Sequence, residues 1–115
     1  MSSKVIQNQK YQTCIYTCND CIEACEACAT ECLREQNVNA MTKCIQLCRE
    51  CAEICGTSSK LMSMDSSYIK GVLSLCVDIC DACSQECRKH QQMEHCKLCA
   101  QTCRRCVEEC RKMVR

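Results

Sequence analysis

The stretch that decides the fold is residues 14–32, which read CIYTCNDCIEACEACATEC. Its six cysteines follow one another at steps of four, three, four, three and four residues. In an α-helix this alternation places all six side chains on one stripe, as the a and d positions of a heptad do. Leucine and isoleucine usually occupy such a stripe, and thiols replace them here. Residues 14–32 therefore predict a helix with one face made of sulfur.

Three further segments repeat this pattern, and the motif CxxCxxxC occurs at least once in each of the four. A buried cysteine can be an ordinary small core residue, but that reading does not explain 19 cysteines in helical register. We therefore take every cysteine as a candidate metal ligand. The candidates are Cys14, Cys18, Cys21, Cys25, Cys28, Cys32, Cys44, Cys48, Cys51, Cys55, Cys76, Cys80, Cys83, Cys87, Cys96, Cys99, Cys103, Cys106 and Cys110.

The chain also carries an internal duplication. A shift of 55 residues maps CIEACEACATEC, which begins at Cys21, onto CVDICDACSQEC, which begins at Cys76. Sixteen cysteines match under this shift, whereas Cys14, Cys18 and Cys96 have no counterpart. We predict two helical hairpins, at about residues 4–55 and 66–112, that form an all-α, antiparallel four-helix bundle with the thiol stripes inside. We expect a single domain over residues 1–115.

Composition agrees with a helical, thiol-filled protein. The chain has no proline, two glycines, no tryptophan and no phenylalanine, so cysteines must supply much of the interior. The net charge of +1 creates no field that favours nucleic acid or an anionic membrane. No segment has the length and apolarity of a membrane span, and the N-terminal segment MSSKVIQNQKYQT lacks the pattern of a secretion signal. We therefore expect a cytoplasmic protein whose thiols serve metal or redox chemistry rather than disulfides.

The two ends of the predicted bundle differ in their side chains. At one end the extended stripes reach Tyr11, Met62, Ile69, Leu73 and Met113, which form an ordinary apolar plug. At the other end they reach Met41, His90 and Met93, near His95, and all four side chains are metal-ligand types. We expect metal to enter at this second end, with His90 and His95 as additional ligands.

Helix-capping residues mark two of the predicted helix starts. Asn39 is the expected N-cap of the second helix, and Asp65 or Ser66 that of the third.

The chemistry of the thiolate selects among the soft metals. Thiolates bind Cu(I), Zn(II) and iron–sulfur clusters. Four stacked tetrahedral zinc sites would leave roughly eight negative charges in a poorly solvated interior, because each Zn(II) with four thiolates keeps about two. One Cu(I) per thiolate leaves none. Helical layers only ~5.4 Å apart would crowd four-iron clusters. Charge and spacing therefore favour many Cu(I) ions over the other two.

Two other functions stay open from the residues alone. One is a thiol redox or persulfide carrier whose cysteines cycle through disulfides. The other is a protein that sequesters zinc or cadmium in the same bundle. A catalytic role is not expected, because thiol enzymes use one or two activated cysteines with a nearby base.

The sequence resembles the cytosolic branch of the copper storage proteins, which are cysteine-rich four-helix bundles. The resemblance covers nearly the whole chain and includes the segment DICDACSQECRKHQQMEHCKLCAQTCRRC, residues 78–106. It implies a bundle filled with Cu(I), with all 19 cysteines as ligands and with His90 and His95 at the mouth. It also implies a homotetramer that stores copper or safely sequesters it. We expect a copper-requiring enzyme or chaperone to receive the stored copper.

Overall fold

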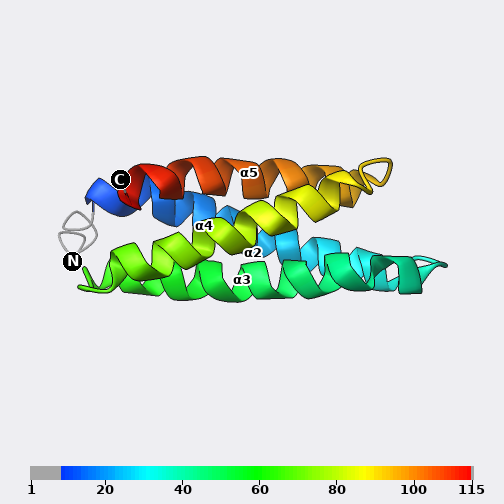
Figure 1. Cartoon of the computed structure of the whole chain (residues 1–115), viewed down its shortest axis with the longest axis horizontal. Helices are drawn as coiled ribbons and strands as arrows, with labels where there is room; N and C mark the ends of the chain where they lie inside the picture. The colour runs from blue at the N-terminus through cyan, green and yellow to red at the C-terminus, as the bar shows by residue number, and fades with distance from the viewer. Residues whose placement is uncertain (1–8, 115) are drawn as a thin grey trace.

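The computed structural model describes residues 9–114 and consists of long antiparallel helices packed side by side (Figure 1). The four α-helices are α2 (Gln12–Leu33), α3 (Thr42–Ser63), α4 (Ile69–Arg88) and α5 (Glu94–Val114). Two short 3-10 helices, η1 (Gln9–Tyr11) and η2 (Val38–Met41), precede α2 and α3. The predicted all-α four-helix bundle is confirmed, and residues 4–8 of its first hairpin lie outside the described residues.

Each helix packs against two neighbours, so the four enclose one core. The hairpins α2–α3 and α4–α5 form the tightest pairs, and α3–α4 and α2–α5 contacts close the bundle. The connections 34–41 and 89–93 lie together at one end, called the mouth below (right in Figure 1). The connection 64–68, η1 and the last turn of α5 lie at the opposite end, called the closed end.

Thiols fill the core along almost its whole length. Every cysteine is buried, and all but Cys14 have an exposed fraction of 0%. Cysteine behaves as a small apolar side chain when it is buried and protonated, so this core can pack without metal. The predicted apolar plug is confirmed at the closed end, where Met62 and Leu73 are fully buried and Ile69 is 5% exposed. Among residues 9–114, no comparable plug of aliphatic side chains lies at the mouth.

The helix ends differ from the capping residues that the sequence suggested. Asn39 lies inside η2 and does not cap α3; its carbonyl oxygen accepts a hydrogen bond from the Thr42 hydroxyl. Asp65 has a φ of 51° and ends α3 instead of starting α4. Its neighbour Ser66 donates its backbone N–H to the Leu61 carbonyl, and Asp65 donates to Met62, which is the Schellman arrangement. The Ser66 hydroxyl does accept a bond from the Tyr68 backbone N–H just before α4.

Candidate metal centre

The cysteines form four complete layers, each with one thiol from every helix. Neighbouring Sγ atoms within a layer lie 3.2–3.9 Å apart. From the closed end to the mouth, the layers are Cys18/Cys55/Cys76/Cys106, Cys21/Cys51/Cys80/Cys103, Cys25/Cys48/Cys83/Cys99 and Cys28/Cys44/Cys87/Cys96. Because the helices are in heptad register, successive layers follow at steps of three or four residues on every helix.

Sulfur contacts also connect the layers to one another. Thiols one turn apart on one helix approach closely, as in Cys76–Cys80 at 3.7 Å and Cys21–Cys25 at 4.0 Å. Steps of at most 4.0 Å join all the cysteines except three at the mouth into one network. Those three, Cys28, Cys32 and Cys96, form a cluster whose sulfurs lie within 4.8 Å of Cys44 Sγ. The thiols thus form a column rather than separate sites.

Groups of four sulfurs close enough to hold one ion overlap along this column. Cys21, Cys25 and Cys106 each belong to two such groups, in which all sulfurs lie within 4.8 Å of one another. Ions held in two of these overlapping groups would therefore share a ligand. Bridging thiolates suit a multinuclear cluster better than isolated four-coordinate sites.

Two incomplete layers end the column. Moving the Cys21/Cys51/Cys80/Cys103 layer by seven residues toward the closed end gives Cys14, Ser58, Leu73 and Cys110. Here Cys14 Sγ lies 3.2 Å from Cys110 Sγ, and Ser58 and Leu73 are both fully buried. A seven-residue move of the Cys25/Cys48/Cys83/Cys99 layer toward the mouth gives Cys32, Met41, His90 and Gln92.

At the mouth, His95 rather than His90 faces the thiols. Its Nδ1 lies 3.5 Å from Cys96 Sγ, 3.6 Å from Cys28 Sγ and 3.9 Å from Cys32 Sγ. Its Nε2 lies 3.2 Å from Glu35 Oε2, so this carboxylate orients the ring. The side chain is 18% exposed and thus forms part of the boundary between the column and solvent.

His90 is held by a carboxylate instead. Its Nε2 lies 3.2 Å from Oε2 of Glu86, a side chain that is 8% exposed. Lys89 Nζ lies 3.3 Å from the other oxygen of this carboxylate, and Lys43 Nζ lies at 4.0 Å. Within residues 9–114, no sulfur lies within hydrogen-bonding distance of the His90 ring. Sequence reasoning placed His90 on the thiol stripe but did not identify Glu86, although its i, i+4 spacing to His90 is a usable signal.

A cavity of about 430 Å³ opens at the mouth beside these residues. Met41, His90 and Met93 line it together with Ala40 and with polar residues of the two connections, Glu35, Gln36, Asn37 and Gln92. Met41 is 2% exposed and belongs to the core, and Met93 is partly buried and packs against it, so both lining side chains also contact the core. The predicted assembly of Met41, Met93 and the histidines at one end is therefore present.

Burial sets the protonation of the thiols nearest the mouth. Loss of solvation raises the pKa of Cys96 to about 11, and it raises the pKa of Cys32 as well. Burial also opposes ionisation of Glu86, but the hydrogen bonds from His90 and Lys89 outweigh it and lower the pKa of this carboxyl. At neutral pH the Cys32 and Cys96 thiols are therefore protonated, and an arriving metal ion must displace their protons.

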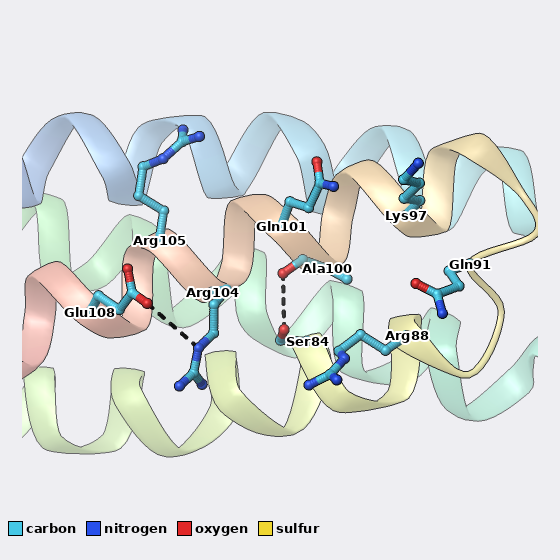
Figure 2. Close-up of a pocket in the computed structure, with 9 residues that line it drawn as sticks. All are labelled: Ser84, Arg88, Gln91, Lys97, Ala100, Gln101, Arg104, Arg105 and Glu108. Atoms are coloured by element: carbon cyan, nitrogen blue, oxygen red, sulfur yellow. Dashed lines mark hydrogen bonds and ion pairs between the residues drawn. The ribbon is translucent and has the colours of Figure 1, made fainter.

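A second hollow lies outside the bundle, between α4 and α5 (Figure 2). This groove of about 420 Å³ is lined mainly by charged and polar side chains and contains no cysteine. Beside it, Arg104 of α5 pairs with Asp81 of α4 at 3.2 Å, and the Ser84 hydroxyl donates to the Ala100 carbonyl at 2.9 Å. The groove is thus separate from the thiol column. The two polar contacts help to join α4 and α5.

Comparison with known proteins agrees with this geometry. The model of the family described as copper storage protein matches residues 7–115. The chain belongs to the copper storage protein family. A curated relative is the cysteine-rich protein YhjQ of Bacillus subtilis, which is 46% identical over 92 residues, or 80% of this chain and 84% of the relative.

Solved structures of copper storage proteins share the fold. The Cu(I)-bound copper storage protein BsCsp3 superposes with a TM-score of 0.87 at 45% identity, and the alignment covers 91% of this chain and 98% of that one. The cytosolic copper storage protein of Streptomyces lividans, loaded with five coppers, superposes with a TM-score of 0.89 at 36% identity over 95% of both chains. None of the described helices is long and apolar enough to span a membrane.

Proposed function

We propose that this chain stores Cu(I) on the thiols of its bundle core, with a capacity on the order of one ion per thiol. The observation that carries the proposal is the column of thiols, in which sulfurs of one layer lie 3.2–3.9 Å apart and sulfurs of neighbouring layers approach to 3.6–4.0 Å. A two-coordinate Cu(I) needs sulfurs about twice a metal–sulfur bond of roughly 2.3 Å apart. Side-chain rotations that open these pairs slightly create many such positions.

Charge favours Cu(I) over Zn(II) in this interior. The buried polar and charged residues among positions 9–114 are Thr17, Ser58, Ser84 and Glu86, so no buried cation offsets an excess of thiolate charge. Each tetrahedral zinc site leaves about two negative charges, whereas Cu(I) bound at one ion per bridging thiolate leaves none. We infer that, of these two metals, only Cu(I) can fill the column without leaving an excess of negative charge.

The test is an anaerobic titration of the reduced, metal-free protein with Cu(I) against a competing chelator, with a parallel Zn(II) titration. We expect Cu(I) to load to roughly the thiol count and zinc to stop near one ion per four thiols. Saturation with one or two Cu(I) ions would refute storage and favour a chaperone. A few thiols that react far faster than the rest, without metal, would favour a redox or persulfide carrier.

We further propose that His95 captures arriving ions and transfers them to the mouth thiols. Replacing His95 with alanine is expected to slow loading by about 10-fold or more, since it removes a ligand held by a carboxylate. Total capacity should fall by no more than about one ion. His90→Ala is the matched control and should slow loading less, because Glu86 holds the His90 ring. Stopped-flow transfer of Cu(I) from a chelator measures both variants, and equal rates for the two would contradict this assignment.

We also propose that the protein is cytoplasmic, has no catalytic activity and passes its copper to a copper-requiring enzyme or chaperone.

We propose in addition that the chain assembles into a homotetramer. The support for assembly is a set of large apolar side chains on the surface that are at least half exposed. They are Tyr16, Leu33, Met64, Tyr68, Leu75 and Leu98. Sedimentation equilibrium should give four times the chain mass of 13.1 kDa, and a monomer at micromolar concentration would contradict it.

A further inference from the structure

Ser58 occupies a thiol position in the closed-end layer. It follows Cys55 by three residues and precedes Met62 by four, so it continues the α3 stripe in register. Its layer contains two thiols, Cys14 and Cys110, and one aliphatic side chain, Leu73. Ser58 and Leu73 both have an exposed fraction of 0%, so solvent does not reach this layer through α3 or α4.

The Ser58 hydroxyl has no hydrogen-bond partner among residues 9–114, although its oxygen is buried. Helical serines and threonines commonly bond the carbonyl four residues earlier, as Thr57 does with Glu53 and Thr30 with Glu26. The Ser58 oxygen makes no such bond. A buried, unsatisfied hydroxyl destabilises a folded protein, and its retention in the core calls for a functional reason.

We propose that Ser58 is a positioning residue of a copper site formed by Cys14 and Cys110, and that its hydroxyl donates a hydrogen bond to a thiolate of the loaded site. This proposal rests on the proposed storage of Cu(I). In the step, one Cu(I) binds two thiols, two protons leave for solvent, and no electron is transferred. The resulting two-coordinate unit carries one net negative charge, and Ser58 is the sole polar partner in its layer.

Loading must change the positions of the sulfurs in the layer of Ser58. Cys14 Sγ and Cys110 Sγ lie only 3.2 Å apart. A Cu(I) ion between them requires about 4.6 Å, twice a metal–sulfur bond of roughly 2.3 Å. At least one sulfur must therefore move away from the other, within a layer whose two other members are Ser58 and Leu73. The hydroxyl oxygen is a hard donor and Cu(I) is a soft ion, so Ser58 acts on the sulfur rather than on the metal.

The test compares Ser58→Ala with the control Ser84→Ala. Ser84 is also a buried serine, 2% exposed, but its hydroxyl already donates to the Ala100 carbonyl (Figure 2). In chelator competition, Ser58→Ala should lower the affinity for about one Cu(I) ion by ~10-fold. This is a usual effect of removing a hydrogen bond to a metal ligand. The unfolding midpoint of its metal-free form should stay equal to that of the wild type or rise. Ser84→Ala should lower that midpoint and leave Cu(I) affinity unchanged.

A double-mutant cycle assigns the effect to the closed-end layer. In a Cys14→Ala/Cys110→Ala background, Ser58→Ala should cause no further loss of affinity, because the thiolate that accepts its bond is absent. Ser58→Cys replaces the hydroxyl with a thiol of similar size. This variant should bind Cu(I) at least as tightly as the wild type.

The outcomes separate this inference from the storage proposal. If the wild type stores many ions but Ser58→Ala binds all of them with unchanged affinity, the role of Ser58 is wrong and storage stands. A 10-fold loss of Cu(I) affinity on Ser58→Ala that persists in the Cys14→Ala/Cys110→Ala background would also overturn the proposed role of Ser58. If the wild type itself saturates at one or two ions, the storage proposal fails first.

Discussion

The metal-free protein is expected to be a folded, cooperative bundle, and loading with Cu(I) should raise its thermal unfolding midpoint by ~20 °C or more. The metal-free fold has support of its own, because fully protonated thiols pack as small apolar side chains against Ile15, Val107, Leu73 and Met62. Each ion that binds only the native state adds about 2.7 kcal/mol when free Cu(I) is 100-fold above its dissociation constant. Many ions bound along the column therefore add up to a large total stabilisation of the folded state.

Circular dichroism of reduced samples, melted with and without Cu(I) under anaerobic conditions, measures this effect. Zn(II) is the matched control metal, and we expect it to raise the unfolding midpoint less than Cu(I) does. A metal-free sample without helical signal would contradict the prediction, because the metal would then drive folding, as it does in small zinc domains.

Replacing one complete layer with alanine should remove about four ions and leave the rest of the store working. The suitable layer is Cys21, Cys51, Cys80 and Cys103, which lies inside the column and contains the short Cys51–Cys80 pair at 3.2 Å. Each Cys→Ala change removes one heavy atom, comparable with a buried methylene that costs about 0.5–1.5 kcal/mol. The sum of ~2–6 kcal/mol lies within the stability of most domains.

Copper content after equilibrium dialysis measures the loss, and circular dichroism shows whether the variant is folded. The matched control is Cys14→Ala/Cys110→Ala, which should remove one or two ions. A proportional loss is the mark of a store made of similar layers. Complete loss of copper in the four-alanine variant would contradict that picture, because it would assign binding to one essential cluster.

The thiol stripes and the burial of their side chains could be predicted from the sequence because both depend on one strong periodicity. Steps of three and four residues fix the stripe on each helix, and the 55-residue repeat gives the register of one hairpin relative to the other. These two features predict four thiol stripes that face one another, whereas the structure shows which cysteines share a layer. The apolar plug at Leu73 and Met62 followed from the same extension of the stripes.

The mouth was harder to predict because it is not periodic. The stripe extended through Arg88 and Lys89 to His90, but α4 ends at Arg88 and the His90 ring turns to Glu86. His95 lies next to Cys96 in sequence, at a position that points away from the stripe in an ideal helix. It meets three sulfurs because it lies in the first turn of α5, where Glu35 from the α2–α3 connection holds its other nitrogen.

Ser58 shows a different limit of sequence reasoning. Its place on the stripe was readable from the steps of three and four, but serine is common in helices and usually bonds its own backbone. Only the structure shows that this hydroxyl is buried and has no hydrogen-bond partner among the residues that the structure describes.

The relation of the layers by seven residues has a consequence for how capacity can change in such a fold. One heptad spans about 10.5 Å of helix and carries two layers. Lengthening all four helices by one heptad would add eight thiols without changing the bundle's cross-section, its mouth or its closed end. Capacity in this architecture is therefore a function of helix length, and a larger reservoir needs only a longer column, not a new site.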